Sequence, residues 1–253
     1  MNTYYYLFYS FIFYAFFGWV LEVIFHIYTQ KKFINRGFLY GPICPIYGVS
    51  AVFFIVFLSR FNNNYVLIFF GGALVASIIE LVTGYLMEVL FNSKWWDYSN
   101  EKFNIKGFIC LRFSIIWGFL SVVFMKFINP PVSRIIFWIM KNFGEVLYSF
   151  LFAGLIVDIV LTVNSLIAFK VLFKELQEIL LETKSSMEEL KENLALEVRE
   201  KIEGRIGYLS DVKERLIARI SQRQIYLIKA YPHMKSKKFD LAIEDIRKRI
   251  HLK

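Results

Sequence analysis

Five stretches of this chain are apolar over about the length that a bilayer crossing requires, and this feature constrains the fold more than any other. A hydrocarbon core needs roughly 20 helical residues at a rise of 1.5 Å each. The chain is also 57% hydrophobic and 19% aromatic, well above the balance of a soluble domain. The sequence therefore predicts an all-α polytopic membrane protein with five transmembrane helices, over residues 4–28, 43–59, 65–91, 110–128 and 146–169.

Charge divides the chain into two parts. Residues 1–169 hold 11 of the 30 Lys and Arg and 7 of the 21 Asp and Glu, although they make up two thirds of the length. We therefore expect a transmembrane domain over 1–169 and a charged cytoplasmic tail over 170–253. The positive excess of both parts suits an anionic membrane surface. Nucleic acid is not an expected partner, because no basic patch is interleaved with exposed aromatic residues.

A two-helix unit is repeated within the membrane domain. The segment from Gly18 to Phe25, which contains Glu22, returns 66 positions later with Glu88 in the place of Glu22. A second segment, 36–48, matches 106–118. Duplication is the simplest interpretation, with repeat units at about 10–60 and 76–128, followed by an interfacial helix at 133–143 and the fifth span. The alternative is that two helix contacts need similar residues.

Carboxylates within the apolar stretches are the main candidates for a functional site. Ionisable residues in a membrane span are costly and commonly functional. Glu80 and Glu88 are two turns apart and so lie on roughly the same helix face. The hypothesis is a polar ligand-binding site formed by Glu22, Glu80 and Glu88, with Arg36 and Arg112 as counter-charges and Asp158 as a further member. The alternative is a set of interhelical hydrogen bonds that only fixes packing.

The loop between the third and fourth expected spans adds three further candidates. Trp96, Asp97 and Tyr98 follow directly after the third span. Tryptophan beside a span is usually an interfacial anchor. A ligand-facing role for these three residues is the alternative.

The distribution of Lys and Arg predicts an orientation. The connections after the first and third spans and the start of the tail contain nine of these residues, against four on the opposite side, namely Arg60, Lys126, Arg134 and Lys141. Positive residues are enriched on the cytoplasmic side. The N-terminus is therefore expected outside and the C-terminus in the cytoplasm.

The tail has the pattern of an amphipathic, coiled-coil-like helix. From Phe173 apolar residues recur three and four positions apart, with Glu and Lys between them. Gly204 and Gly207 interrupt this pattern, so a hairpin turning there and one long rod are both open. A short last helix is expected over 239–250. Self-association through the tail is a further expectation.

No cofactor or metal site is indicated. The two cysteines, Cys44 and Cys110, do not occupy equivalent repeat positions and form no ligand pattern. The chain has no Gly-x-x-x-x-Gly-Lys-Ser/Thr motif, so it carries no phosphate-binding loop of this type.

Several motifs together resemble a known family. They are Gly37-Phe-Leu-Tyr-Gly-Pro42, Pro45-Ile-Tyr-Gly48, Thr83-Gly84, Trp96-Asp-Tyr-Ser99, Cys110-Leu111 and Trp117-Gly118, with Glu80, Glu88, Asn104 and Gly107. Over most of residues 10–169 the chain resembles the bacterial putative ABC-transporter type IV permease family. The resemblance implies a multi-pass protein of the bacterial cytoplasmic membrane and a transport permease, and it implies no established substrate. The lead 106–109 into Cys110 departs from the expected shorter and more polar form.

Three functions are compatible with these features. The first is a transporter permease subunit with an acidic intramembrane site, working in the bilayer with a separate ATPase. The second is a non-transporting membrane sensor or envelope-assembly scaffold that binds a lipid headgroup or a partner protein. The third, an enzyme using Glu22, Glu80 and Glu88 as acid and base, is least favoured, because paired carboxylates alone define no reaction.

Overall fold

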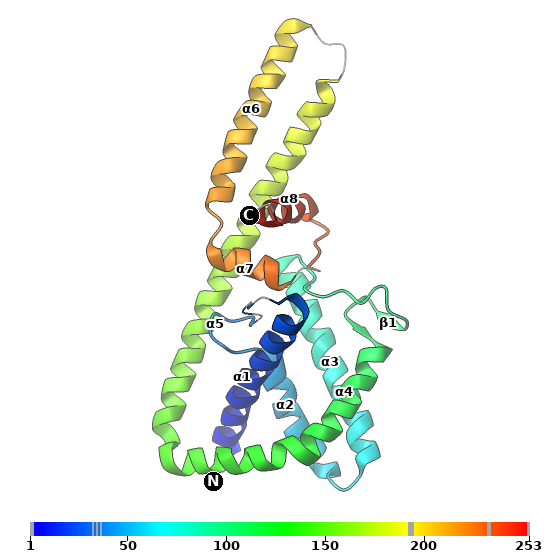
Figure 1. Ribbon diagram of the computed structural model, residues 1–253, viewed down its shortest axis with the longest axis vertical. Coiled ribbons are helices and arrows are strands. Elements are labelled where there is room, and N and C mark those ends of the chain that lie inside the picture. Colours follow the sequence, from blue (N-terminus) through cyan, green and yellow to red (C-terminus); the bar gives the residue numbers. More distant parts are fainter. Residues whose placement is uncertain are drawn as a thin grey trace. The chain divides into compact units, whose positions relative to one another are not determined.

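The computed structural model describes residues 3–31, 33, 35, 37–191, 195–231 and 234–251 (Figure 1). They form two compact units. The first comprises residues 1–87 and 96–163, and the second comprises residues 88–95 and 164–253. The main division falls at 163/164, and the second unit also contains residues 88–95, which include the end of the third helix. Each unit is described by itself.

The first unit is built from apolar helices. They are α1 (Thr3–Gln30), α2 (Pro45–Leu58) with a 3-10 turn (Ser59–Phe61), α3 (Tyr65–Phe91) up to Met87, α4 (Leu111–Val123) with a π turn (Phe124–Ile128), and α5 (Asn129–Glu189) up to Val163. Among the described residues, three helical stretches are long and apolar enough to cross a membrane: Thr3–Thr29, Tyr65–Phe91 and Leu111–Glu189. The stretch Pro45–Phe61 is apolar but shorter. The chain is thus a helical membrane protein, and the count of five spans stays a prediction.

A proline explains where α2 begins, and a second lies near the start of α5. Pro45 opens α2, with extended backbone at Cys44 before it. Pro130 follows Asn129 at the start of α5. Proline suits a first helical turn because its missing N–H has no intrahelical partner there. We expected Asn129 and its prolines to end the fourth helix; instead the helical stretch continues through them, from the π turn into α5.

The expected fourth span and interfacial helix form one helical stretch, which a kink in α5 separates from the helix that contains the expected fifth span. The kink lies at Gly144, whose φ of 42° and ψ of −125° are not helical (Figure 1). Glycine tolerates this conformation because it has no Cβ. The residues around the bend pack on the first half of α1: Tyr9 donates to the Gly144 carbonyl at 2.6 Å, and Tyr6 shares a hydrogen bond with Ser133 at 2.8 Å.

The loop between α3 and α4 contains a small β-hairpin. Strands β1 (Asn104–Ile105) and β2 (Ile109–Cys110) pair antiparallel. Gly107 between them has a φ of +73° and donates its N–H to the Asn104 side chain at 3.1 Å. This short sheet was not expected from the sequence, and it places Cys110 directly before α4.

The second unit is a helical hairpin with two shorter helices against it. It contains the end of α5, α6 (Leu196–Ala218), α7 (Gln222–Ala230) and α8 (Asp240–His251). Ion pairs Arg205–Glu182 and Arg219–Glu175 join α6 to α5 in antiparallel order. α5 ends at Glu189, and Gly204 and Gly207 lie within α6, so the alternative of a hairpin turning at these glycines is wrong. The predicted last helix is confirmed as α8.

The core of the second unit is apolar and draws on α5, α7 and α8. Phe173, Leu176, Ile228 and Ile243 are among its buried residues. Ser221 and Gln224 form a capping box at the start of α7. The side chain of Gln177 on α5 accepts the Ala242 N–H at 3.0 Å. These contacts hold the shorter helices against α5.

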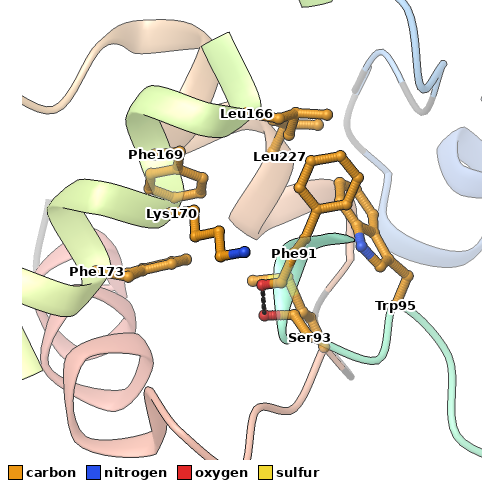
Figure 2. Close-up of a pocket in the computed structure, with 9 residues that line it drawn as sticks. Phe91, Ser93, Trp95, Leu166, Phe169, Lys170, Phe173 and Leu227 are labelled. Carbon is orange, nitrogen blue, oxygen red and sulfur yellow. Dashed lines mark hydrogen bonds between the residues drawn. The ribbon is translucent and has the colours of Figure 1, made fainter. Parts of the chain in front are cut away.

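Residues 88–95, which contain the end of α3, are held in the second unit by several contacts. Lys94 and Lys235 form an isolated antiparallel bridge, and the ring of Trp95 contacts that of Tyr231 edge to face. Lys170 on α5 donates to the carbonyl of Leu90 at 2.9 Å, near the end of α3. Figure 2 shows Lys170 reaching between aromatic rings of α5 and the side chains of Phe91, Ser93 and Trp95.

A candidate polar site in the membrane unit

Glu80 is the most enclosed carboxylate of the membrane unit. Its side chain lies on α3, and the residue is only 7% exposed. The hydroxyl of Tyr98 donates to Oε1 at 3.1 Å, and the indole N–H of Trp117 on α4 donates to Oε2 at 3.3 Å. Both donors are neutral, and among the described residues Glu80 takes part in no ion pair. Glu80 therefore brings an acidic group into an apolar bundle without a described counter-charge.

Glu22 occupies a related position on α1. The hydroxyl of Tyr47 on α2 donates to its Oε1 at 2.6 Å. The ring of Tyr47 lies so close to Gly18 that a Cβ there would come within 2.4 Å of it. The absence of a side chain at Gly18 thus lets the aromatic ring lie flat on α1 and reach the carboxylate one turn further along.

The contacts of Glu22 and Glu80 match. In the first helix pair, Tyr47 contacts Glu22, and the next residue, Gly48, lies against the carbonyl of Phe11. In the second, Trp117 contacts Glu80, and Gly118 lies against the carbonyl of Phe69. These contacts pair Glu22 with Glu80. The register expected from the sequence, which paired Glu22 with Glu88, is not the one that the packing follows.

Tyr98 is the loop residue that reaches this site. Its ring stacks on Phe113 of α4 at 4.7 Å between centroids, and its backbone N–H bonds the Gly107 carbonyl. Burial raises the pKa of the Tyr98 phenol, and the negative charges of Glu80 and, more weakly, Glu22 add to the effect. Tyr98 therefore stays protonated and remains a hydrogen-bond donor at neutral pH.

Trp96 and Asp97 hold the loop in shape. The indole N–H of Trp96 donates to the Phe108 carbonyl at 2.9 Å, and its ring lies beside Gly84 of α3. The carboxylate of Asp97 accepts the backbone N–H of Ser99 at 3.0 Å and the hydroxyl of the same residue. Of the three predicted loop residues, the contacts bring only Tyr98 to a carboxylate of the site.

Asp158 is satisfied by backbone groups of a different loop. Its two oxygens accept the N–H groups of Tyr40 at 2.8 Å and Gly41 at 2.9 Å, and Thr162 donates to it at 3.3 Å. A Cβ at Gly41 would lie 2.8 Å from this carboxylate, so the close approach requires glycine. Through these hydrogen bonds Asp158 connects α5 to the loop after α1.

The three remaining predicted residues are not seen at Glu80, and one of them lies outside the residues that the structure describes. Arg112 forms an exposed ion pair with Glu101 at 3.4 Å and is not seen to pair with Glu80. Glu88 belongs to the second unit, whereas Glu22 and Glu80 belong to the first. Arg36 lies outside the described residues. The structure therefore brings together Glu80, Tyr98 and Trp117, and pairs Glu22 with Tyr47.

Sequence reasoning missed Tyr47 and Trp117. Both are aromatic residues directly before a glycine, at matching places in the second helix of each pair. The glycines mark where the helices approach closely, so an aromatic donor one position earlier lies near the same contact. That pattern was the signal that could have identified both residues.

The small cavity of the second unit does not add a ligand site. It measures about 20 Å³ and is lined mainly by apolar side chains such as Phe91, Phe169 and Phe173 (Figure 2). That space suffices for about one water molecule. Among the described residues, no group of three or more His, Cys, Asp or Glu is placed to hold a metal ion.

Comparison with known proteins gives one match. Residues 9–163 match the family model described as "Putative ABC-transporter type IV". The match ends where the first unit ends, so it contains Glu22, Glu80 and Asp158 and leaves out the helical hairpin. Neither the search of curated proteins nor that of solved structures found a match. Since the matched segment covers more than half of the chain and contains the polar contacts described above, the chain belongs to the putative ABC-transporter type IV family.

Proposed function

We propose that this protein is the membrane-spanning permease subunit of a transporter that works with a separate ATPase. The observation that carries the proposal is the enclosure of Glu80, whose two oxygens are held by the neutral donors Tyr98 and Trp117. Family membership supports a transporter-related role. The ATPase is a separate chain in this proposal, because the sequence has no phosphate-binding loop of the Gly-x-x-x-x-Gly-Lys-Ser/Thr type.

In this proposal the carboxylates of Glu22 and Glu80 supply negative charge to a cationic group of the solute. A carboxylate removed from water is costly unless a cation or hydrogen-bond donors compensate it. Tyr98 and Trp117 compensate Glu80 in part, and a cation would add the charge that neutral donors lack. Aromatic rings beside the carboxylates are also favourable neighbours for a cation.

The first experiment tests the ATPase partnership. The full chain would be purified in a mild detergent from its native membrane, and ATP hydrolysis by the purified complex would be measured. Co-purification of ATP hydrolysis that is lost with the chain would support the permease. A chain that purifies free of hydrolytic activity under conditions that preserve its fold would contradict it.

The second experiment tests the role of Glu80. Glu80→Gln keeps the shape and removes the charge, so we expect loss of transport-dependent growth together with unchanged expression and melting. Glu101→Gln is the matched control, since Glu101 is a loop acid that pairs with Arg112. Full growth of the Glu80→Gln strain would show that Glu80, Tyr98 and Trp117 only pack together and that the charge of Glu80 is not needed for transport.

A second candidate function is a membrane sensor or envelope-assembly scaffold. The helical hairpin favours it, because this unit projects charged helices rather than apolar ones and lies outside the family match. The two candidates differ in their partners. Purification with a cell-wall or regulatory protein, and without ATP hydrolysis, would favour the scaffold.

A further inference from the structure

One part of the second unit has positive charge without nearby acidic residues in the sequence. Between Glu214 and Asp240 the chain contains seven Lys and Arg and no Asp or Glu. Lys235, Lys237 and Lys238 at the end of this run are exposed. We call these three residues, together with Lys94, the lysine surface.

Backbone contacts hold the lysine surface in place. Lys94 donates its N–H to the Lys235 carbonyl at 2.7 Å, and Lys235 returns the bond at 3.0 Å. Directly opposite residues of an antiparallel pair project their side chains to the same face. The hydroxyl of Ser236 donates to the Asn92 carbonyl and accepts the N–H of Lys238 at 3.2 Å. The lysines are therefore presented on a fixed backbone.

The lysine surface lies just past the end of an apolar span. The candidate span of α3 ends at Phe91, and Val89 and Leu90 near its end are 53% and 55% exposed. Lys94 follows three residues later. Exposed apolar residues next to a basic segment mark the boundary between the hydrocarbon core and the headgroups. The bridge between Lys94 and Lys235 thus holds the lysines beside the end of this candidate span.

Several cations elsewhere in the second unit are paired with acids. Arg205 pairs with Glu182, and Arg249 pairs with Glu214. Lys237 and Lys238, by contrast, take part in no ion pair among the described residues. The nearest acid in sequence, Asp240, accepts the backbone N–H of Ser236 at 3.3 Å. Lys237 and Lys238 therefore carry positive charge that no described acid pairs with.

We propose that the lysine surface binds the phosphate headgroups of anionic phospholipids. Clustered Lys next to a span is attracted to anionic lipid, and this attraction is screened by salt. The apolar end of α3 would contact the acyl chains while the lysines contact the phosphates. The proposal concerns the second unit only and does not depend on the transport function.

The test measures lipid preference with the full chain in detergent. Binding of fluorescent phosphatidylglycerol and fluorescent phosphatidylcholine would be followed by anisotropy. We expect about tenfold tighter binding of phosphatidylglycerol at low salt, and a smaller ratio at high salt. In the triple variant Lys235→Gln, Lys237→Gln, Lys238→Gln the ratio should fall to about twofold or less.

The matched control removes three exposed lysines from the hairpin: Lys184→Gln, Lys191→Gln and Lys201→Gln. This control should keep the full preference, and both variants should keep the wild-type circular dichroism spectrum. An equal loss in the control, a retained preference in the first variant, or no preference in the wild type would overturn the proposal. Displacement of the lipid by millimolar inorganic phosphate would assign the surface to a soluble anion and would also overturn it.

Discussion

The two units stabilise charged groups in opposite ways. In the first unit, Glu80 and Asp158 are satisfied by an aromatic hydroxyl, an indole N–H and backbone N–H groups. In the second, exposed carboxylates pair with arginines across helices, as in Glu182–Arg205. Exposed pairs contribute little because water screens them, whereas an acceptor in an apolar bundle becomes costly once its donor is lost. Removing the partner of a buried carboxylate in the first unit should therefore cost more stability than removing one exposed ion pair in the second.

Helix packing shows the same contrast between the units. A Cβ at Gly48 would lie 2.6 Å from the carbonyl of Phe11, whereas nothing lies within 4 Å of a Cβ built at Gly204 or Gly207. At Gly48 the membrane helices need glycine for close approach. The exposed helix α6 tolerates it. We therefore expect a substitution at a closely packed glycine to cost far more stability than one at an exposed glycine.

Gly48→Val should have the largest effect. The valine side chain meets backbone and the Cβ of Ala15, neither of which can rotate away, so α1 and α2 must separate. We expect a loss of about 3 kcal/mol or more in the free energy of unfolding. The melting temperature in detergent would measure it. A variant that melts like the wild type would show that the two helices are not closely packed.

Asp158→Ala should have a smaller but clear effect. The change leaves the N–H groups of Tyr40 and Gly41 without their acceptor and costs about 2 kcal/mol. Asp158→Asn keeps one oxygen acceptor and should fall between alanine and the wild type. Thermal melting of the three proteins side by side tests this order. If Asp158→Ala and the wild type had the same melting temperature, these hydrogen bonds would not stabilise the fold.

Gly204→Ala should stabilise the second unit slightly. Alanine fits an exposed helix interior and reduces the freedom of the unfolded chain, for a gain of about 0.5–1 kcal/mol. Helical content by circular dichroism during thermal melting would detect it. The same change at Gly48 is the control and should destabilise. A loss of stability at Gly204 would indicate a contact that the hairpin makes with another chain.

The Glu214–Arg249 pair should give the smallest effect and a defined pH dependence. Its hydrogen bond with Arg249 lowers the pKa of Glu214 in the folded protein. The pair therefore contributes stability above the unfolded pKa of about 4.3 and loses it as pH falls through the lower folded value. The melting difference between the wild type and Glu214→Gln should shrink between pH 6 and pH 3. If the difference in melting temperature stayed constant over this range, the Glu214–Arg249 pair would not be its cause.

The sequence predicted the helices well because the length of an apolar run determines a bilayer-crossing helix almost by itself. Residues 65–91 were predicted as the third helix and are α3. The partners of Glu80 could not be predicted, because Tyr98 and Trp117 lie 18 and 37 residues away and depend on packing. Local identity suggested a match of Glu22 with Glu88, whereas glycine contacts determine the helix register.

The turn of the hairpin was misplaced for a related reason. Glycine usually marks a turn, and Gly204 and Gly207 were the only glycines in the tail. An exposed helix accepts each at a cost of about 1 kcal/mol. The chain instead turns after Glu189, where the ion pairs between α5 and α6 come into antiparallel register. The position of the turn thus depends on contacts between helices.

The hydrogen bonds between the Tyr40 loop and Asp158 also set an order of events during synthesis. The two partners are separated by 118 residues. At about 5–20 residues per second, a ribosome needs roughly 6–24 s to make the acceptor after it has made the donors. During that interval α1 and α2 are already available for insertion, while the N–H groups of their connecting loop have no acceptor from α5. Synthesis of the first helix pair therefore precedes completion of the hydrogen bonds of its own loop, which depend on the arrival of α5.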